Sequence, residues 1–130
     1  MSAFASPSNE QLMRAVEVVG DAVRETCPAD VASVLLLLGG DESLLFAVIE
    51  FLAHRDPILT AADDRRLFHQ ETIARRVLKR LSSETPIGTT ELALELGLPS
   101  AIVCQVLGWL DRDGRIKIDI DADSLKVRLA

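Results

Sequence analysis

Few of the side chains that most often carry out chemistry in proteins are present in this chain. The two cysteines, Cys27 and Cys104, form no CxxC pair, and neither His54 nor His69 has a Ser or Cys at nucleophile spacing. The stretch 39–41 lacks the Lys-Ser or Lys-Thr that a phosphate-binding loop needs. We therefore expect no catalytic, cofactor-binding or metal-binding residues, no small-molecule substrate and no enzyme activity. Both cysteines are expected to be small, buried or half-buried residues in a reducing compartment.

Basic side chains gather at two places in the second half of the chain, one within an amphipathic stretch and one within alternating strands. Two interpretations stay open: a solvated surface, with Lys126 and Arg128 near Asp119 or Asp121, or a surface that grips phosphate. Two further polar residues, Gln105 and Arg112, lie on the helix expected at 99–113. The candidate nucleic-acid contacts are Arg75, Arg76, Lys79, Arg80, Gln105, Arg112, Arg115, Lys117, Lys126 and Arg128.

The net charge of −6 argues against general binding of polyanions, because such proteins usually carry a basic surplus. The charge is also unevenly divided. Residues 1–66 hold five Lys or Arg against eleven Asp or Glu, whereas residues 67–130 hold nine of each. The first half is therefore acidic and the second half neutral, so only the second half offers a candidate surface for phosphate.

The elements that must position these residues occur twice, because the chain repeats itself at an offset of 58 residues. Segment 38–58 aligns with segment 96–116 without a gap, and the offset also places Leu67 on Leu125 and Asp63 on Asp121. The identical pairs within the segment are Leu38 and Leu96, Gly39 and Gly97, Val48 and Val106, Leu52 and Leu110, and Ile58 and Ile116. The sequence thus predicts two copies of one structural unit.

Each copy reads as three helices followed by two short strands. Capping residues are expected at Ser8 with Gln11, at Asp41, and at Thr89 or Thr90, and Pro99 is expected at the first position of a helix. Turns are expected at 61–64 and 122–123. The expected helices cover about 8–26, 29–38, 42–55, 70–82, 90–97 and 99–113, and the expected strands 58–60, 66–68, 116–121 and 125–129. The alternating isoleucines of the strand expected at 116–121 should face a core.

The stretch TTELALELGLPSAIVCQVLGWLDRDGRIKI resembles the helix-turn-helix and wing of the winged-helix superfamily, and the resemblance covers about residues 83–129. Within it, VLGWLDRDGRI resembles small bacterial and archaeal winged-helix proteins. The tandem order also resembles ScpB, MukE and ESCRT-II subunits in architecture. The resemblance implies a mainly α fold with small β-hairpins: two tandem winged-helix units, residues 1–68 and 69–130.

The two copies differ in what they present to solvent. In winged-helix DNA binders the third helix enters the major groove, and there repeat one offers mainly acidic and small residues, which would repel phosphate. Repeat one also carries apolar residues where repeat two is polar. These candidate protein-interface residues are Leu12, Val18, Val31, Leu37 and Leu59, opposite Gln70, Arg76, Thr89, Glu95 and Lys117. They would cover repeat two, form a homodimer seam or bind a partner.

Two functions follow as hypotheses. The first is a non-catalytic protein-interaction or scaffold module, part of a larger assembly or a homo-oligomer. The second is a DNA-binding regulator of transcription or chromosomes that uses the second winged helix. The first ten residues carry no signal-peptide pattern, and the longest apolar runs are too short for a bilayer, so we expect a cytoplasmic protein without membrane contact.

Overall fold

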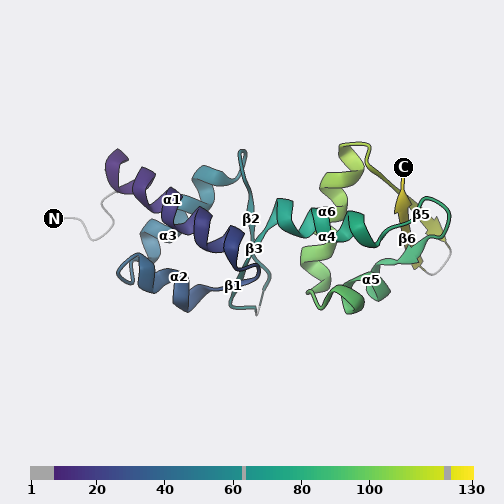
Figure 1. Cartoon of the computed structure of the whole chain (residues 1–130), viewed down its shortest axis with the longest axis horizontal. Coiled ribbons are helices and arrows are strands. Elements are labelled where there is room, and N and C mark those ends of the chain that lie inside the picture. The colour runs from purple at the N-terminus through teal and green to yellow at the C-terminus, as the bar shows by residue number, and fades with distance from the viewer. Residues whose placement is uncertain (1–7, 63, 122–123) are drawn as a thin grey trace. The chain divides into compact units, whose positions relative to one another are not determined.

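The chain divides into two compact units, residues 1–69 (unit 1) and 70–130 (unit 2). The computed structural model describes residues 8–62, 64–121 and 124–130 (Figure 1). The turn expected at 122–123 lies outside the described residues, as does residue 63 of the turn expected at 61–64.

Unit 1 begins with the predicted capping box. The Ser8 hydroxyl accepts a hydrogen bond from the Gln11 backbone N–H, and the Gln11 side chain accepts one from the Ser8 backbone. The second helix starts two residues later than expected, because Ala29 and Asp30 pair with β3 and the Asp30 carboxylate then caps the helix. The elements are α1 (Asn9–Glu25), β1 (Ala29–Asp30), α2 (Val31–Leu37), α3 (Glu42–Leu52), β2 (Ile58–Leu59) and β3 (Arg66–His69).

Unit 2 repeats this order. The expected cap at Thr89 or Thr90 is wrong: the extended Gly88 is the N-cap, since the chain passes directly from β4 into the helix. Pro99 is likewise an N-cap rather than the first helical residue. The elements are α4 (Gln70–Arg80), β4 (Ile87–Gly88), α5 (Thr89–Leu96), α6 (Ser100–Arg112), β5 (Ile116–Asp121) and β6 (Ser124–Leu129).

Both units have the same sheet topology, and it is that of a winged helix. The strand order is β1-β3-β2 in unit 1 and β4-β6-β5 in unit 2, all antiparallel. Four elements of unit 2 begin 58 residues after their counterparts: β4 after β1, α5 after α2, α6 after α3 and β5 after β2. The protein is therefore mainly α with small β-hairpins, in a tandem double winged-helix arrangement.

The offset of 58 ends inside the hairpin. Ile58 pairs with His69, but Ile116 pairs with Leu129, so the hairpin of unit 2 is two residues longer. Leu67 therefore corresponds to Val127, not to Leu125 as the sequence alignment had it; Leu67 and Val127 are both buried, whereas Leu125 is exposed.

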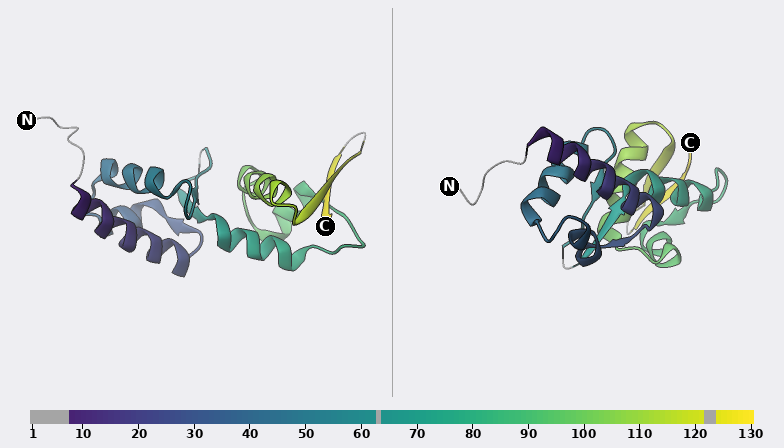
Figure 2. Two further views of the ribbon diagram at one scale, coloured as in Figure 1. Left: turned by 90° about the horizontal axis from the view of Figure 1, so that it is seen from above. Right: turned by 60° about the vertical axis from the view of Figure 1, so that its left-hand side comes forward.

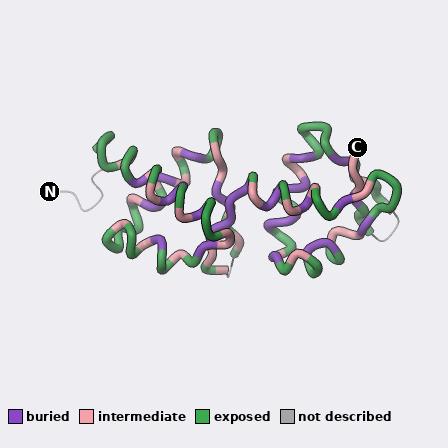
Figure 3. The backbone as a smooth tube through the Cα atoms, in the orientation of Figure 1, coloured by how far each residue is buried: buried purple, intermediate pink, exposed green. Residues whose placement is uncertain are grey.

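The core of unit 1 lies between α1 and α3, which run alongside each other (Figure 2). Buried and exposed segments alternate along α1, as in any helix with one apolar face (Figure 3). Each fully buried Val or Leu stabilises such a core by roughly 1.5–3 kcal/mol. The buried apolar side chains of the two helices are Ala15, Val19 and Val23 on α1 and Leu45, Val48 and Leu52 on α3.

The core of unit 2 does not extend to the end of its hairpin. Ile116 and Val127 are buried, but Ile120 is 81% exposed and its cross-strand partner Leu125 is 44% exposed. The expectation that the alternating isoleucines face a core is wrong at Ile120. Both exposed residues lie beyond the part of the sheet that β4 joins, since the two residues of β4 pair only with Lys126 and Val127.

No single helix among the described residues is long and apolar enough to cross a membrane. Two bent pairs, α2 with α3 and α5 with α6, would be so only together, and their members meet at 103° and 115°.

Candidate interaction surfaces

A shallow groove of about 210 Å³ lies on unit 1 between α1 and the α2–α3 turn. The residues that α1 contributes follow the spacing i, i+3, i+4, i+7, which places them on one face of the helix. Leu37, which lines the groove at the end of α2, is 59% exposed although it is a large apolar residue. The groove is lined by Gln11, Arg14, Ala15, Val18, Leu37, Leu38 and Leu44.

The structure brings together only two of the five predicted interface residues. Val18 and Leu37 both line the groove. Leu12 and Val31 are half-buried and pack against the core of unit 1. Leu59 lies in β2, half-buried and paired with Phe68. The groove is therefore the place where the sequence-derived interface residues and an observed surface feature coincide.

Three exposed large apolar residues of unit 1 were not singled out from the sequence. Leu36 is 79% exposed, Phe46 is 69% exposed, and Met13 is exposed as well. Phe46 carried a signal: it follows Glu42 and precedes Glu50 by four residues each, which places it on the polar face of the third helix.

The side chains of His69 and Cys27 in unit 1 take part in structural contacts. The buried His69 places its Nε2 2.6 Å from Asp56 Oδ1, and Arg24 donates to Asp56 Oδ2 at 2.9 Å. The Cys27 Sγ, half-buried as expected, accepts a hydrogen bond from the His69 backbone N–H at 3.4 Å. The expectation is wrong for Cys104, which is exposed because it lies on α6 opposite the buried side of that helix. These contacts link three parts of unit 1: the end of α1, the turn that precedes β2, and strand β3.

The four cations of α4 are largely engaged within unit 2. Arg75 pairs with Glu71 at 3.0 Å, and Arg76 donates to the Leu96 carbonyl at 2.9 Å. Arg80 forms a two-pronged ion pair with Glu95 on α5, and its guanidinium holds the pKa of the Glu95 carboxyl below the usual range. Lys79 is exposed.

The remaining candidate contacts lie on α6 and on or next to the wing, which is the hairpin of β5 and β6. Gln105 is exposed, and Arg112 Nε donates to the Gly108 carbonyl at 3.4 Å. The register places Lys117 directly opposite Arg128, while Arg128 Nε lies 3.3 Å from Asp119. Arg115 and Lys126 are also exposed. The wing thus carries a pair of adjacent cations, partly neutralised by one carboxylate.

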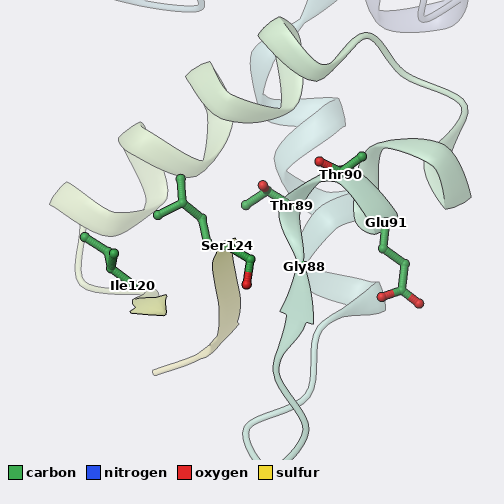
Figure 4. Close-up of a pocket in the computed structure, with 7 residues that line it drawn as sticks. Gly88, Thr89, Thr90, Glu91, Ile120 and Ser124 are labelled. Carbon is green, nitrogen blue, oxygen red and sulfur yellow. The ribbon is translucent and has the colours of Figure 1, made fainter. Parts of the chain in front are cut away.

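A second pocket, of about 570 Å³, lies in unit 2 beside the part of β6 that pairs with β5 but not with β4. Ser124 lies across from Gly88 and Thr89, and the Glu91 side chain points away from them (Figure 4). The exposed Ile120 and Leu125 belong to the same pocket. It is wide and open, and Glu91 is the charged residue among the described residues that line it.

No protein-family model matches the chain, and a comparison with curated proteins finds no match. Among solved structures, unit-sized similarity is found to the transcriptional regulator HlyU from Vibrio vulnificus CMCP6, with 26% identity over 46% of this chain and 68% of that chain and a TM-score of 0.38. The ESCRT-II endosomal trafficking complex matches at 10% identity over 99% and 96% of the two chains, with a TM-score of 0.49. ScpB from Mycobacterium tuberculosis matches at 14% identity over 97% and 94%, with a TM-score of 0.36.

Proposed function

We propose that this chain is a non-catalytic protein-interaction module and that the groove on unit 1 is a docking site for a protein partner. The observation that carries the proposal is that the exposed Leu37 lines a groove whose lining is mostly apolar. Large apolar residues gathered at an exposed groove usually mark an interface, because burying them would be favourable.

The charge of unit 1 supports a protein partner rather than a nucleic acid. Residues 1–69 hold five Lys or Arg against eleven Asp or Glu. Phosphate would be repelled from such a unit, since nucleic-acid binding draws on Lys and Arg contacts.

The proposal is tested by placing a charge in the groove. The full chain and its Leu37→Asp variant are used as bait in the source cell, and captured proteins are quantified by mass spectrometry. Leu94→Asp is the matched control, because Leu94 is also an exposed leucine on a helix but lies on unit 2, outside the groove. We expect Leu37→Asp to lose specific partners that the control keeps. Equal capture by both variants, with no change in sedimentation of the chain, would rule out the groove.

DNA binding by unit 2 is the second candidate, favoured by the adjacent cations Lys117 and Arg128 on the wing. Fluorescence anisotropy with a labelled duplex pool tests it. If the duplex binds at sub-micromolar strength near physiological salt and the double variant Lys117→Ala, Arg128→Ala removes binding, the DNA function is supported. Absence of binding even at low salt eliminates it, because phosphate contacts strengthen steeply as salt falls.

A further inference from the structure

The outer face of α3 carries an exposed aromatic ring between two carboxylates. Phe46 lies four residues from both Glu42 and Glu50, and all three side chains are exposed. Residues four apart on a helix are neighbours, with Cβ atoms about 5–6 Å apart. The carboxylates therefore flank the ring along the helix.

No cation of its own segment balances these carboxylates. Residues 25–53 contain five Asp or Glu and no Lys, Arg or His; His54 and Arg55 follow directly, and the Arg55 guanidinium lies over the Phe51 ring. The stretch includes the whole of α2 and α3. This face is therefore negatively charged and suited to bind a positive group.

In unit 1, the other described phenylalanines each have an arginine guanidinium over the ring. The guanidinium carbon of Arg55 lies 4.5 Å from the centre of the Phe51 ring, and that of Arg66 lies 5.3 Å from the centre of Phe68. Of the phenylalanines in the described part of the chain, Phe46 is the one over which no cation is recorded. Its ring is left open to solvent, with acids on either side.

We infer that the face formed by Glu42, Phe46 and Glu50 binds an arginine side chain from a protein partner. The guanidinium stacks on the Phe46 ring, within the roughly 6 Å over which a cation and a ring attract each other. Its N–H groups then donate to a flanking carboxylate. Arginine fits better than lysine because its planar group can stack and form two hydrogen bonds at once.

The inference rests on the proposed function only in that the arginine belongs to a protein. The site is separate from the groove, since Phe46 is not among the residues that line it. A second copy of unit 1 would not suit this face, because each copy carries a surplus of acidic residues. A phosphate-bearing ligand is excluded by the same charge.

The test uses the full chain and a fluorescein-labelled helical peptide that carries two arginines one turn apart on a leucine-bearing face. A matched peptide has citrulline, which keeps the shape of arginine without its charge. We expect the arginine peptide to bind more tightly than the citrulline peptide in fluorescence anisotropy, and its binding to weaken with salt. Equal binding of the two peptides would overturn the inference.

Variants then assign the site. Phe46→Leu should weaken the arginine peptide about two- to fivefold, the loss expected for an exposed cation–ring contact. The double variant Glu42→Gln, Glu50→Gln should weaken it by up to about tenfold. Glu17→Gln, an exposed acid on α1, is the matched control and should leave binding unchanged. Because the substituted residues are exposed, all variants should keep the unfolding temperature of the parent.

Three outcomes would count against the inference. The first is unchanged binding by Phe46→Leu and by the double variant; the second is an equal loss with Glu17→Gln. The third is self-association that Phe46→Leu abolishes, seen by sedimentation equilibrium, which would assign the arginine to a second copy. Failure of the peptide while Leu37→Asp still loses its partners would remove this inference and leave the proposed function standing.

Discussion

Asp56 contacts side chains from two different elements of unit 1, α1 and β3. One of its oxygens faces the ring nitrogen of the buried His69, and the other accepts from Arg24 of α1. Arg24 in turn pairs with Asp21, whose carboxylate is the main reason that the pKa of Arg24 is raised. A buried polar group that loses its hydrogen-bond partner destabilises a protein more than an exposed one does.

Replacing Asp56 should therefore destabilise unit 1. We expect Asp56→Ala to lower the free energy of unfolding by about 1–3 kcal/mol, because both the contact with the buried His69 ring and the ion pair with Arg24 would be lost. Asp21→Ala, which removes the exposed partner of the same arginine, should cost no more than about 0.5 kcal/mol. Urea unfolding followed by circular dichroism measures both. Equal losses would show that the contact with His69 has no special weight.

At the scale of the element, a glycine marks the end of α5. Gly97 ends α5 with a φ of +65°, a conformation that residues with a Cβ adopt only at a cost. Gly108, by contrast, lies inside α6, and a Cβ there would meet nothing within 4 Å.

The same substitution should thus have opposite effects at the two positions. Gly97→Ala is expected to destabilise unit 2 by about 1–2 kcal/mol, because alanine is strained at positive φ. Gly108→Ala should stabilise it by about 0.5–1 kcal/mol, because alanine loses less backbone freedom in a helix. The fluorescence of the single Trp, Trp109 on α6, reports the unfolding of this unit. A stabilising effect at Gly97 would contradict the assigned helix end.

The ion pair between Arg80 and Glu95 joins α4 to α5 and gives unit 2 a pH dependence. The pKa of Glu95 is lower in the folded protein than its ordinary value of 4.5, chiefly through the hydrogen bond from Arg80. The stabilisation is then complete above the ordinary pKa and is lost as the pH falls through the lower, folded value.

We expect Glu95→Gln to reduce the loss of stability of unit 2 in acid. Between neutral pH and about pH 3, the parent should lose more stability than the variant, because only the parent must protonate this carboxylate. Urea unfolding monitored by Trp109 fluorescence at both pH values tests this. Glu84→Gln, at an exposed acid for which no ion pair is recorded among the described residues, is the control and should behave like the parent. Identical pH profiles for Glu95→Gln and the parent would contradict the prediction.

At the scale of the whole molecule, one topology serves two different surfaces. Unit 1 is acidic and leaves Leu36, Leu37 and Phe46 exposed, whereas unit 2 is neutral and carries the candidate DNA contacts. Each unit has buried residues from its own helices and its own sheet. A core of its own is what allows a segment to fold alone.

The residues 70–130 should therefore fold as a separate fragment. A domain of this size is small but within the range that folds without disulfides or metals. We expect a cooperative urea transition by Trp109 fluorescence and a dispersed amide spectrum for the fragment. A non-cooperative transition would show that unit 2 depends on unit 1, and the predicted domains 1–68 and 69–130 would then not be independent.

The sequence by itself determined the six helices, the strands of the two hairpins and their order, but not the two-residue strands β1 and β4. Capping at Ser8 and Asp41, the glycine stop at Gly97 and the alternation from Ile116 onward are local signals, and local backbone preferences set the helix ends and strands that they mark. The repeat fixed the count of two units, because the same apolar spacing must bury the same faces twice. The candidate site was predicted in part: Val18 and Leu37 line the groove, and Phe46 was missed.

Only the tertiary structure decided which apolar residues stay exposed. Leu12 and Leu37 are both leucines on helices, but Leu12 packs against the core while Leu37 borders the groove. Burial depends on which neighbours cover a side chain, and spacing along the chain does not specify them. The same holds for the hairpin of β5 and β6, which is two residues longer than that of unit 1 and leaves Ile120 and Leu125 exposed. Pairing across strands is a long-range property, so it could not be read from the 58-residue offset alone.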